Sequence, residues 1–151
     1  MPSSLEKFSI VVDSNENCRG HAWTFPGYKV HVQSLLKQGC DYSIRGQVGT
    51  VGVERKSYAD YVRCIGADWP RFQRQLAKLA TNRIHAVIVE GSIDDPIPQQ
   101  SMMIHDSVIH QTAYIVSCGM PVLFAGSKTK AAMLCASFFK HALHRIRHSG
   151  D

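Results

Sequence analysis

A glutamate and a lysine stand two residues apart near the end of a predicted strand. Side chains alternate between the two faces of a strand, so Glu54 and Lys56 project to the same side. Asp41 lies on the preceding predicted strand. If these two strands pair antiparallel through a turn at Arg45-Gly46, Asp41 comes to lie beside Glu54. Two carboxylates and one lysine would then converge at the open end of the strands.

This set of side chains suits metal-assisted hydrolysis of a phosphodiester. Two carboxylates and a backbone carbonyl can hold a Mg²⁺ that keeps several of its waters. A metal held in this way polarises a phosphoryl oxygen, and a lysine can orient or deprotonate the attacking water or neutralise developing charge. On spacing alone a second interpretation is more common. In it, Glu54 and Lys56 form an exposed ion pair worth less than about 1 kcal/mol.

Three further acidic residues each have two interpretations. Asp13 and Glu16 follow the first predicted strand, and sites in α/β sheets gather at such strand ends. The residues around Asp13 are equally typical of a turn. Asp60 stands three residues after Ser57, so it fits a helix cap. It also stands one helical turn beyond Lys56, where it would fix the lysine or a basic neighbour.

The order of the predicted elements indicates an α/β domain with a mixed sheet between helix layers. Ser57 is a natural cap for a helix that would run to about Ile65. The polar segment 14–27 is expected to be a loop, and 34–37 a short turn or helix. The other predicted elements are strands over 8–13, 30–32, 41–44, 47–54, 84–90 and 121–125, and helices over 70–80, 101–118 and 127–147.

Length and composition narrow the classes of protein to consider. The chain has 151 residues, which predicts a single domain over residues 1–151. Apolar residues make up 44% and charged residues 19%, an ordinary globular composition. No apolar run approaches the roughly 18 residues of a membrane span, and residues 1–7 lack the layout of a signal peptide. We therefore expect a cytoplasmic protein, or a nuclear one in a eukaryote, with no membrane association.

The net charge suggests what kind of partner the protein binds, and the cysteines suggest that its thiols are reduced. The formal net charge is +5, and the sequence pI is about 9.1. A basic balance suits a polyanionic partner, because each neutralised phosphate releases condensed counterions. The five cysteines are scattered and form no C-x-x-C pair. This favours reduced thiols over a disulfide framework or a zinc site.

The same residues resemble a known family. Glu54-Arg55-Lys56 followed by Asp60 resembles the Glu-Arg-Lys-x-x-x-Asp signature of the XPF-type nuclease domain, whose members are structure-specific DNA endonucleases. The resemblance covers roughly residues 8–146 and is strongest toward stand-alone bacterial and phage members. Further segments match in order: Asp13-Ser14-Asn15-Glu16, Trp23-Thr24-Phe25-Pro26, Asp41 to Gly46, Arg71-Phe72-x-x-Gln75-Leu76, Val87 to Gly91 and Pro121 to Phe124.

The resemblance implies a restriction-endonuclease-like mixed β-sheet flanked by helices, and it implies a role for each central residue. Asp41 and Glu54 would bind Mg²⁺ or Mn²⁺, together with the backbone carbonyl of Arg55. Lys56 would serve the attacking water. Arg55 would support the geometry from the opposite face of its strand, where it is less exposed to substrate.

The resemblance also assigns the neighbouring positions. Asp13 and Glu16 would complete the catalytic set by lining the site, and Asp60 would support its geometry. Arg71 and Gln75, on the following helix, would reach the DNA backbone. Two departures from the family pattern stand close to these residues, and neither removes a metal ligand. Cys40 replaces the glycine that usually precedes the metal-binding aspartate, and Asn15 replaces an arginine.

Basic residues crowd the last predicted helix. One interpretation is a packed amphipathic helix with a solvated polar face. The other is a surface that contacts DNA phosphates through Lys128 and Lys130, or that forms a dimer. Because XPF-type nuclease domains commonly pair, the resemblance implies a two-fold homodimer. The basic and histidine residues are Lys128, Lys130, Lys140, His141, His144, Arg145, Arg147 and His148.

Three functions stand open at this point. The first is a metal-dependent endonuclease that cuts branched, flap or junction DNA in repair or recombination, without a nucleotide cofactor. The second is a non-catalytic DNA-binding or scaffolding module of the same fold. Inactive relatives have usually lost the acidic or lysine positions, however, and all of them are present here. A small-molecule α/β enzyme is disfavoured, because no Gly-rich phosphate loop or nucleophile motif is found.

Overall fold

The chain folds around one mixed sheet in this computed structural model, which describes residues 7–149. β3 (Tyr42–Ile44) runs antiparallel to both β1 (Ile10–Asp13) and β4 (Val51–Ser57), whereas β1 and β2 (Val30–Gln33) pair parallel, as do β4, β5 (Ile84–Glu90) and β6 (Val122–Phe124). The predicted α/β class with a mixed sheet is confirmed, and so is the presence of each predicted strand. In sheet order the strands are β2, β1, β3, β4, β5 and β6.

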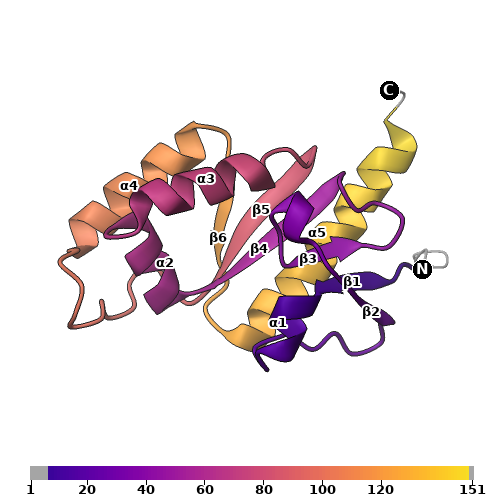
Figure 1. The fold of residues 1–151 in the computed structure, drawn as a ribbon, viewed down its shortest axis with the longest axis horizontal. Coiled ribbons are helices and arrows are strands. Elements are labelled where there is room, and N and C mark those ends of the chain that lie inside the picture. Colours follow the sequence, from indigo (N-terminus) through magenta and orange to yellow (C-terminus); the bar gives the residue numbers. More distant parts are fainter. Residues whose placement is uncertain (1–6, 150–151) are drawn as a thin grey trace.

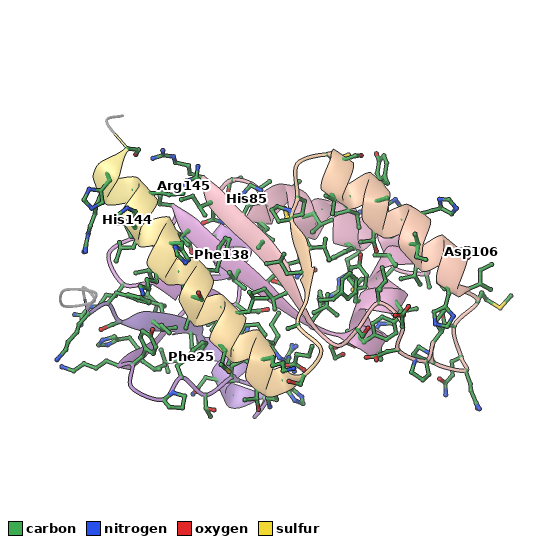
Figure 2. The ribbon with its side chains drawn as sticks, turned by 180° about the vertical axis from the view of Figure 1, so that it is seen from behind. Phe25, His85, Asp106, Phe138, His144 and Arg145 are labelled. Carbon is green, nitrogen blue, oxygen red and sulfur yellow. The ribbon has the colours of Figure 1, made fainter. Side chains whose placement is uncertain are left out.

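Helices cover both faces of this sheet. α5 (Lys128–His148) lies across one face, and Figure 2 shows it in front of the strands. The other face carries α2 (Tyr58–Ile65), α3 (Trp69–Leu79) and α4 (His105–Ser117), which lie on the near side in Figure 1. Each face buries its own apolar cluster. β5 is therefore buried on both sides through its centre, as its continuous apolar run predicted.

Three predicted boundaries are wrong. The strand predicted over 47–54 is β4, Val51–Ser57, because Gln47 O accepts hydrogen bonds from Thr50 N and Val51 N in a turn that precedes the strand. Segment 14–27 is not entirely loop, because Ser14–Cys18 form a short helix, α1, whose first turn is capped by the Asp13 side chain. A helix of five residues is too short to show an apolar period. α4 begins at His105 rather than at Ser101, since the Ser101 hydroxyl accepts a hydrogen bond from Met103 N and holds a local turn instead. The predicted short helix after β2 is the 3₁₀ helix η1 (Leu36–Gln38).

The two helices that follow β4 form for reasons visible in the sequence. Ser57 caps α2 by accepting a hydrogen bond from Asp60 N at 3.1 Å. Pro70 lies in the first turn of α3, where its missing N–H costs nothing. Apolar residues at i, i+4 and i+7 of α3 are buried against the sheet: Phe72, Leu76 and Leu79. This packing leaves the opposite side of α3 free to face solvent.

Within residues 7–149, no helix is long and apolar enough to cross a membrane. The expectation about the layout of residues 1–7 falls almost wholly outside the described part of the chain.

Candidate active site

Three carboxyl groups, two of them buried and that of Asp41 half-buried, meet where β3 and β4 pair. The register sets Tyr42 against Val53, which places Asp41 beside Glu54 as antiparallel pairing predicted. Glu16 reaches the same point from α1, and the carboxyl groups of Glu16 and Glu54 both lie against that of Asp41. Burial, with repulsion among the three groups as the second cause, raises the pKa of Asp41 and the pKa of Glu16, the latter to about 7. Repulsion of this kind is relieved when a proton or a cation is bound among the groups.

A lysine and a glutamine converge on one oxygen of this cluster. Lys56 Nζ lies 3.4 Å from Glu54 Oε1, and Gln75 Nε2 donates to the same oxygen at 3.0 Å. The lysine stem crosses Phe72, with Nζ 5.5 Å from the ring centroid. Burial disfavours the charged ammonium, but the Glu54 carboxylate outweighs this and raises the pKa of Lys56. Gln75 therefore contacts the acidic cluster itself. The resemblance had predicted only a contact with the DNA backbone.

Arg55 holds the cluster from the opposite face of β4. Its backbone N–H donates to Asp41 Oδ2 at 2.8 Å, while its guanidinium donates to both oxygens of Glu90, at 2.6 and 3.1 Å. The same guanidinium lies 3.2 Å from Glu16 Oε1. Trp23 Nε1 completes this buried network by donating to Glu90 at 2.6 Å. The side chain of Arg55 is thus engaged with carboxylates, as expected of a supporting residue.

Asp13 and Asp60 lie at the cleft, but their carboxylates are engaged elsewhere. Asp13 accepts hydrogen bonds from Leu35 N at 2.7 Å and from Asn15 N at 3.1 Å, so it fixes two backbone segments. This is the turn chemistry that its neighbours favoured. Asp60 pairs with Arg63 at 2.9 Å on the surface. Asp60 therefore holds the basic neighbour rather than Lys56.

The acidic cluster forms the floor of a cleft of about 700 Å³. The cleft runs from α1 across the ends of β3 and β4 to α3. Its walls carry several cations, although its floor is acidic. A basic rim around an acidic floor can attract a phosphate chain while the floor holds a cation. The basic residues that line the cleft are Arg19, Arg55, Lys56, Arg63, Arg71, Arg74 and Lys78.

Lys128 and Lys130 do not line this cleft. Lys128 borders a second hollow of about 720 Å³, between α5 and the segment that contains Phe25. Figure 2 shows Phe25 beside the first turns of α5. Lys130 lines neither hollow, and its backbone N–H donates to Ser127, the cap of α5. The structure brings Arg71 to the acidic floor and leaves these two lysines apart from it.

The two departures from the family pattern are accommodated locally. Cys40 is buried, and its Cβ would lie 3.1 Å from a Cβ added at Gly52. The Cys40 side chain therefore fits because Gly52 on β4 has no side chain. Gly39, one position earlier, adopts the left-handed backbone at φ 68°. Asn15 provides no cation, but Arg19 stands four residues later and lines the same cleft. The register of β3 on β4 is kept.

Glu90 and Trp23 are site residues that the sequence reasoning did not identify. Glu90 ends β5, and the register pairs it with Ser57 at the end of β4. An acidic residue at the end of a buried parallel strand was the available signal, since strand ends of neighbouring parallel strands share one edge. Trp23 gave no such signal, because it lies in an irregular segment that is 67 positions from Glu90.

The donor chemistry of the floor fits a hard divalent cation. In the part of the chain that the structure describes, no three His, Cys, Asp or Glu side chains are arranged to hold a metal by themselves. Mg²⁺ does not require such a group, because it is commonly held by one or two carboxylates and keeps several waters. Half-buried Asp41 and buried Glu54 supply two adjacent carboxyls, and the nearby Glu16 Oε1 is already paired with the Arg55 guanidinium at 3.2 Å. Asp41 and Glu54 could therefore hold a cation that relieves their crowding.

Two solved structures share this fold across nearly the whole chain. One is XPF from Aeropyrum pernix in complex with DNA, with a TM-score of 0.70 and 20% identity over 91% of this chain and 66% of that one. The other is XPF from Aeropyrum pernix, with a TM-score of 0.68 and 20% identity over 92% and 67% of the two chains. No family model and no curated protein matches the chain. The expected resemblance to the XPF-type domain is thus confirmed in the fold.

Proposed function

We propose that this protein is a metal-dependent DNA endonuclease. The observation that carries the proposal is the convergence of half-buried Asp41 and buried Glu54 with Lys56 on the floor of a basic cleft. The cations of the cleft would attract a phosphodiester chain, and the floor would act on one of its bonds. The fold shared with XPF from Aeropyrum pernix, of which one structure contains DNA, supports the same assignment.

Each residue of the floor has a defined task in this proposal. Asp41 and Glu54 hold Mg²⁺ or Mn²⁺, with the backbone carbonyl of Arg55 as a further ligand. The cation, when bound, polarises the phosphoryl group and stabilises the charge that develops on it. Lys56 orients the attacking water and adds positive charge near the reacting phosphate. Glu16 lines the floor and aligns Asp41 and Arg55.

The substrate and assembly follow from the resemblance to XPF-type domains. We infer that branched, flap or junction DNA is cut during repair or recombination. Such a substrate places the protein in the bacterial cytoplasm or in a eukaryotic nucleus. We also infer a homodimer, since a two-fold pair is the simplest closed assembly of identical domains. α4 offers an exposed apolar stripe for this purpose, formed by Ile109, Ala113 and Val116.

The proposal is tested by incubating the purified protein with flap, fork and junction DNA in Mg²⁺ or Mn²⁺. The unsubstituted protein should nick at least one of these DNAs. Asp41→Ala and Glu54→Ala should each reduce the rate at least about 100-fold, in line with the loss of one preorganised electrostatic contact. Asp94→Ala is the matched control, because Asp94 is exposed and outside the cleft.

Two outcomes would contradict the proposal. If Asp41→Ala and Glu54→Ala both cut DNA as fast as the unsubstituted protein, these two residues would not be part of the catalytic site. DNA bound tightly but left uncut in every divalent metal would favour the alternative, a non-catalytic DNA-binding or scaffolding module of the same fold.

A further inference from the structure

Three cations form one stripe along the exposed side of α3. Arg71, Arg74 and Lys78 stand at i, i+3 and i+7, and all three line the catalytic cleft. α3 contains no acidic residue. Neighbours at this spacing lie on one side of a helix, so the three charges point in a common direction. The stripe is a continuous cationic edge along one wall of the cleft.

The charge of this stripe is not neutralised by the protein. Across residues 7–149, no carboxylate forms an ion pair with any of its three members. Arg63 lines the same cleft and differs, since it pairs with Asp60 at 2.9 Å and with Asp68 at 3.4 Å. The stripe is therefore the part of the cleft whose positive charge is available to an anionic ligand.

The stripe is centred on the acidic floor. Gln75, which stands between Arg74 and Lys78, donates to Glu54. Arg71 and Arg74 thus precede the residue that contacts Glu54 along the helix, and Lys78 follows it. Seven residues of helix rise about 10 Å. One DNA strand carries a charge about every 3.4 Å along the duplex axis, so the stripe has the length of about three phosphate-to-phosphate steps.

Lys78 is held in place by the backbone of the neighbouring segment. A Cβ added at Gly39 would lie 2.8 Å from Lys78 Cγ, so the lysine stem rests directly against the glycine. Gly39 also requires a positive φ of 68°. A stem packed in this way loses less conformational freedom when its ammonium binds a phosphate. Arg19, at the end of α1, adds a cation to the cleft from outside α3.

We propose that Arg71, Arg74 and Lys78 form the track that holds the cleaved DNA strand, with phosphates bound on both sides of the bond to be cut. A strand that passes through the cleft in this way is cut internally rather than from an end. This inference rests on the proposed function and names the surface that binds its substrate. It gives Lys128 and Lys130 no part, because they lie outside the cleft.

The track is tested by DNA binding rather than by cleavage. Binding of a fluorescein-labelled flap DNA is measured by anisotropy in EDTA at several NaCl concentrations. Log affinity falls as log salt rises, and the triple variant R71A/R74A/K78A should make this slope shallower by about 2 to 3, because each phosphate contact contributes about 0.9 to its magnitude. The matched control is K128A/K130A/K140A, which removes the same charge from exposed positions on α5. Its slope should change by less than about 1.

Further variants keep the outcome clear. The charge-preserving variant R71K/R74K/K78R should retain the slope of the unsubstituted protein. If the triple variant does not fold, Arg74→Ala alone should make the slope shallower by about 1. An unchanged slope in the α3 variants, an equal loss in the α5 control, or no DNA binding by the unsubstituted protein would overturn the track. Cleavage by the unsubstituted protein reports separately on the proposed function, so either idea can fail without the other.

Discussion

Arg55 joins three segments of the chain at the back of the acidic cluster. Its guanidinium contacts Glu90 on β5 and Glu16 on α1, and its backbone N–H holds Asp41. Glu16 is buried, at 8% exposed, and Glu90 and Asp41 are half-buried. A buried carboxylate that loses its cation cannot be rescued by solvent, which makes Arg55 important for stability as well as for the position of Asp41.

Replacing Arg55 should therefore destabilise the protein strongly. We expect Arg55→Ala to lower the free energy of unfolding by about 3–5 kcal/mol, the cost of breaking a buried ion pair from one side. Arg63→Ala is the control, since it breaks an exposed pair and should cost less than about 1 kcal/mol. Urea unfolding followed by circular dichroism measures both. Equal costs for the two variants would mean that the Arg55 network contributes no more than a surface pair.

The alternation of side chains explains which of these residues could be predicted. Period-two spacing on β4 placed Glu54 and Lys56 on one face and Arg55 on the other, and the structure agrees. The partner of Arg55 could not be found in this way, because Glu90 is 35 positions away and its place depends on the parallel pairing of β4 with β5. Similarly, the contact of Gln75 with Glu54 depends on how α3 packs.

At the scale of elements, the start of α2 is coupled to the candidate active site. Lys56 and the capping residue Ser57 are adjacent, so the first turn of α2 and this lysine share one stretch of backbone. α5 begins in the same manner at Ser127, whose side chain accepts a hydrogen bond from Lys130 N at 3.1 Å. The two caps are chemically alike, but only the first is next to the acidic cluster.

The two caps provide a matched pair of substitutions. Ser57→Ala and Ser127→Ala should each lower the free energy of unfolding by about 1 kcal/mol, the usual cost of losing a serine cap. Only Ser57→Ala should also slow DNA cleavage, because it loosens the backbone that carries Lys56. Urea unfolding and initial cleavage rates on flap DNA measure the two effects. A cleavage rate that falls equally in both variants would show that the coupling is not specific to α2.

Long, strongly patterned elements were predictable and short ones were not. β5 was predicted at its observed bounds, since an apolar run of this length is typical of a strand buried on both faces. α1 has five residues and depends on a cap from Asp13 together with the contacts of Glu16, so no periodic signal precedes it. The start of α4 depended on a hydrogen bond between Ser101 and Met103, which competes locally with helix formation.

On the scale of the whole molecule, the two faces of the sheet are covered unequally. α5 and the segment that contains Trp23 and Phe25 cover one face, whereas α2, α3 and α4 share the other. α4 buries one stripe against the sheet and leaves a neighbouring apolar stripe exposed, with Ile109 50% and Val116 47% exposed. Ala113 lies between them at helical spacing, so a second helix could approach closely. α4 contains no lysine or arginine, which makes this surface unsuited to DNA.

The exposed stripe of α4 is thus the surface on which the inferred homodimer can be tested. We expect the unsubstituted protein to be a dimer by light scattering at about 50 μM, a concentration at which an interface of micromolar affinity is mostly occupied. Ile109→Lys with Val116→Lys should yield a monomer, because two buried charges would face each other across a two-fold axis. Met133→Lys, at an exposed apolar position on α5, should leave the dimer intact. A monomeric unsubstituted protein would refute the dimer, and a dimer that survives the α4 substitutions would place its interface on another surface.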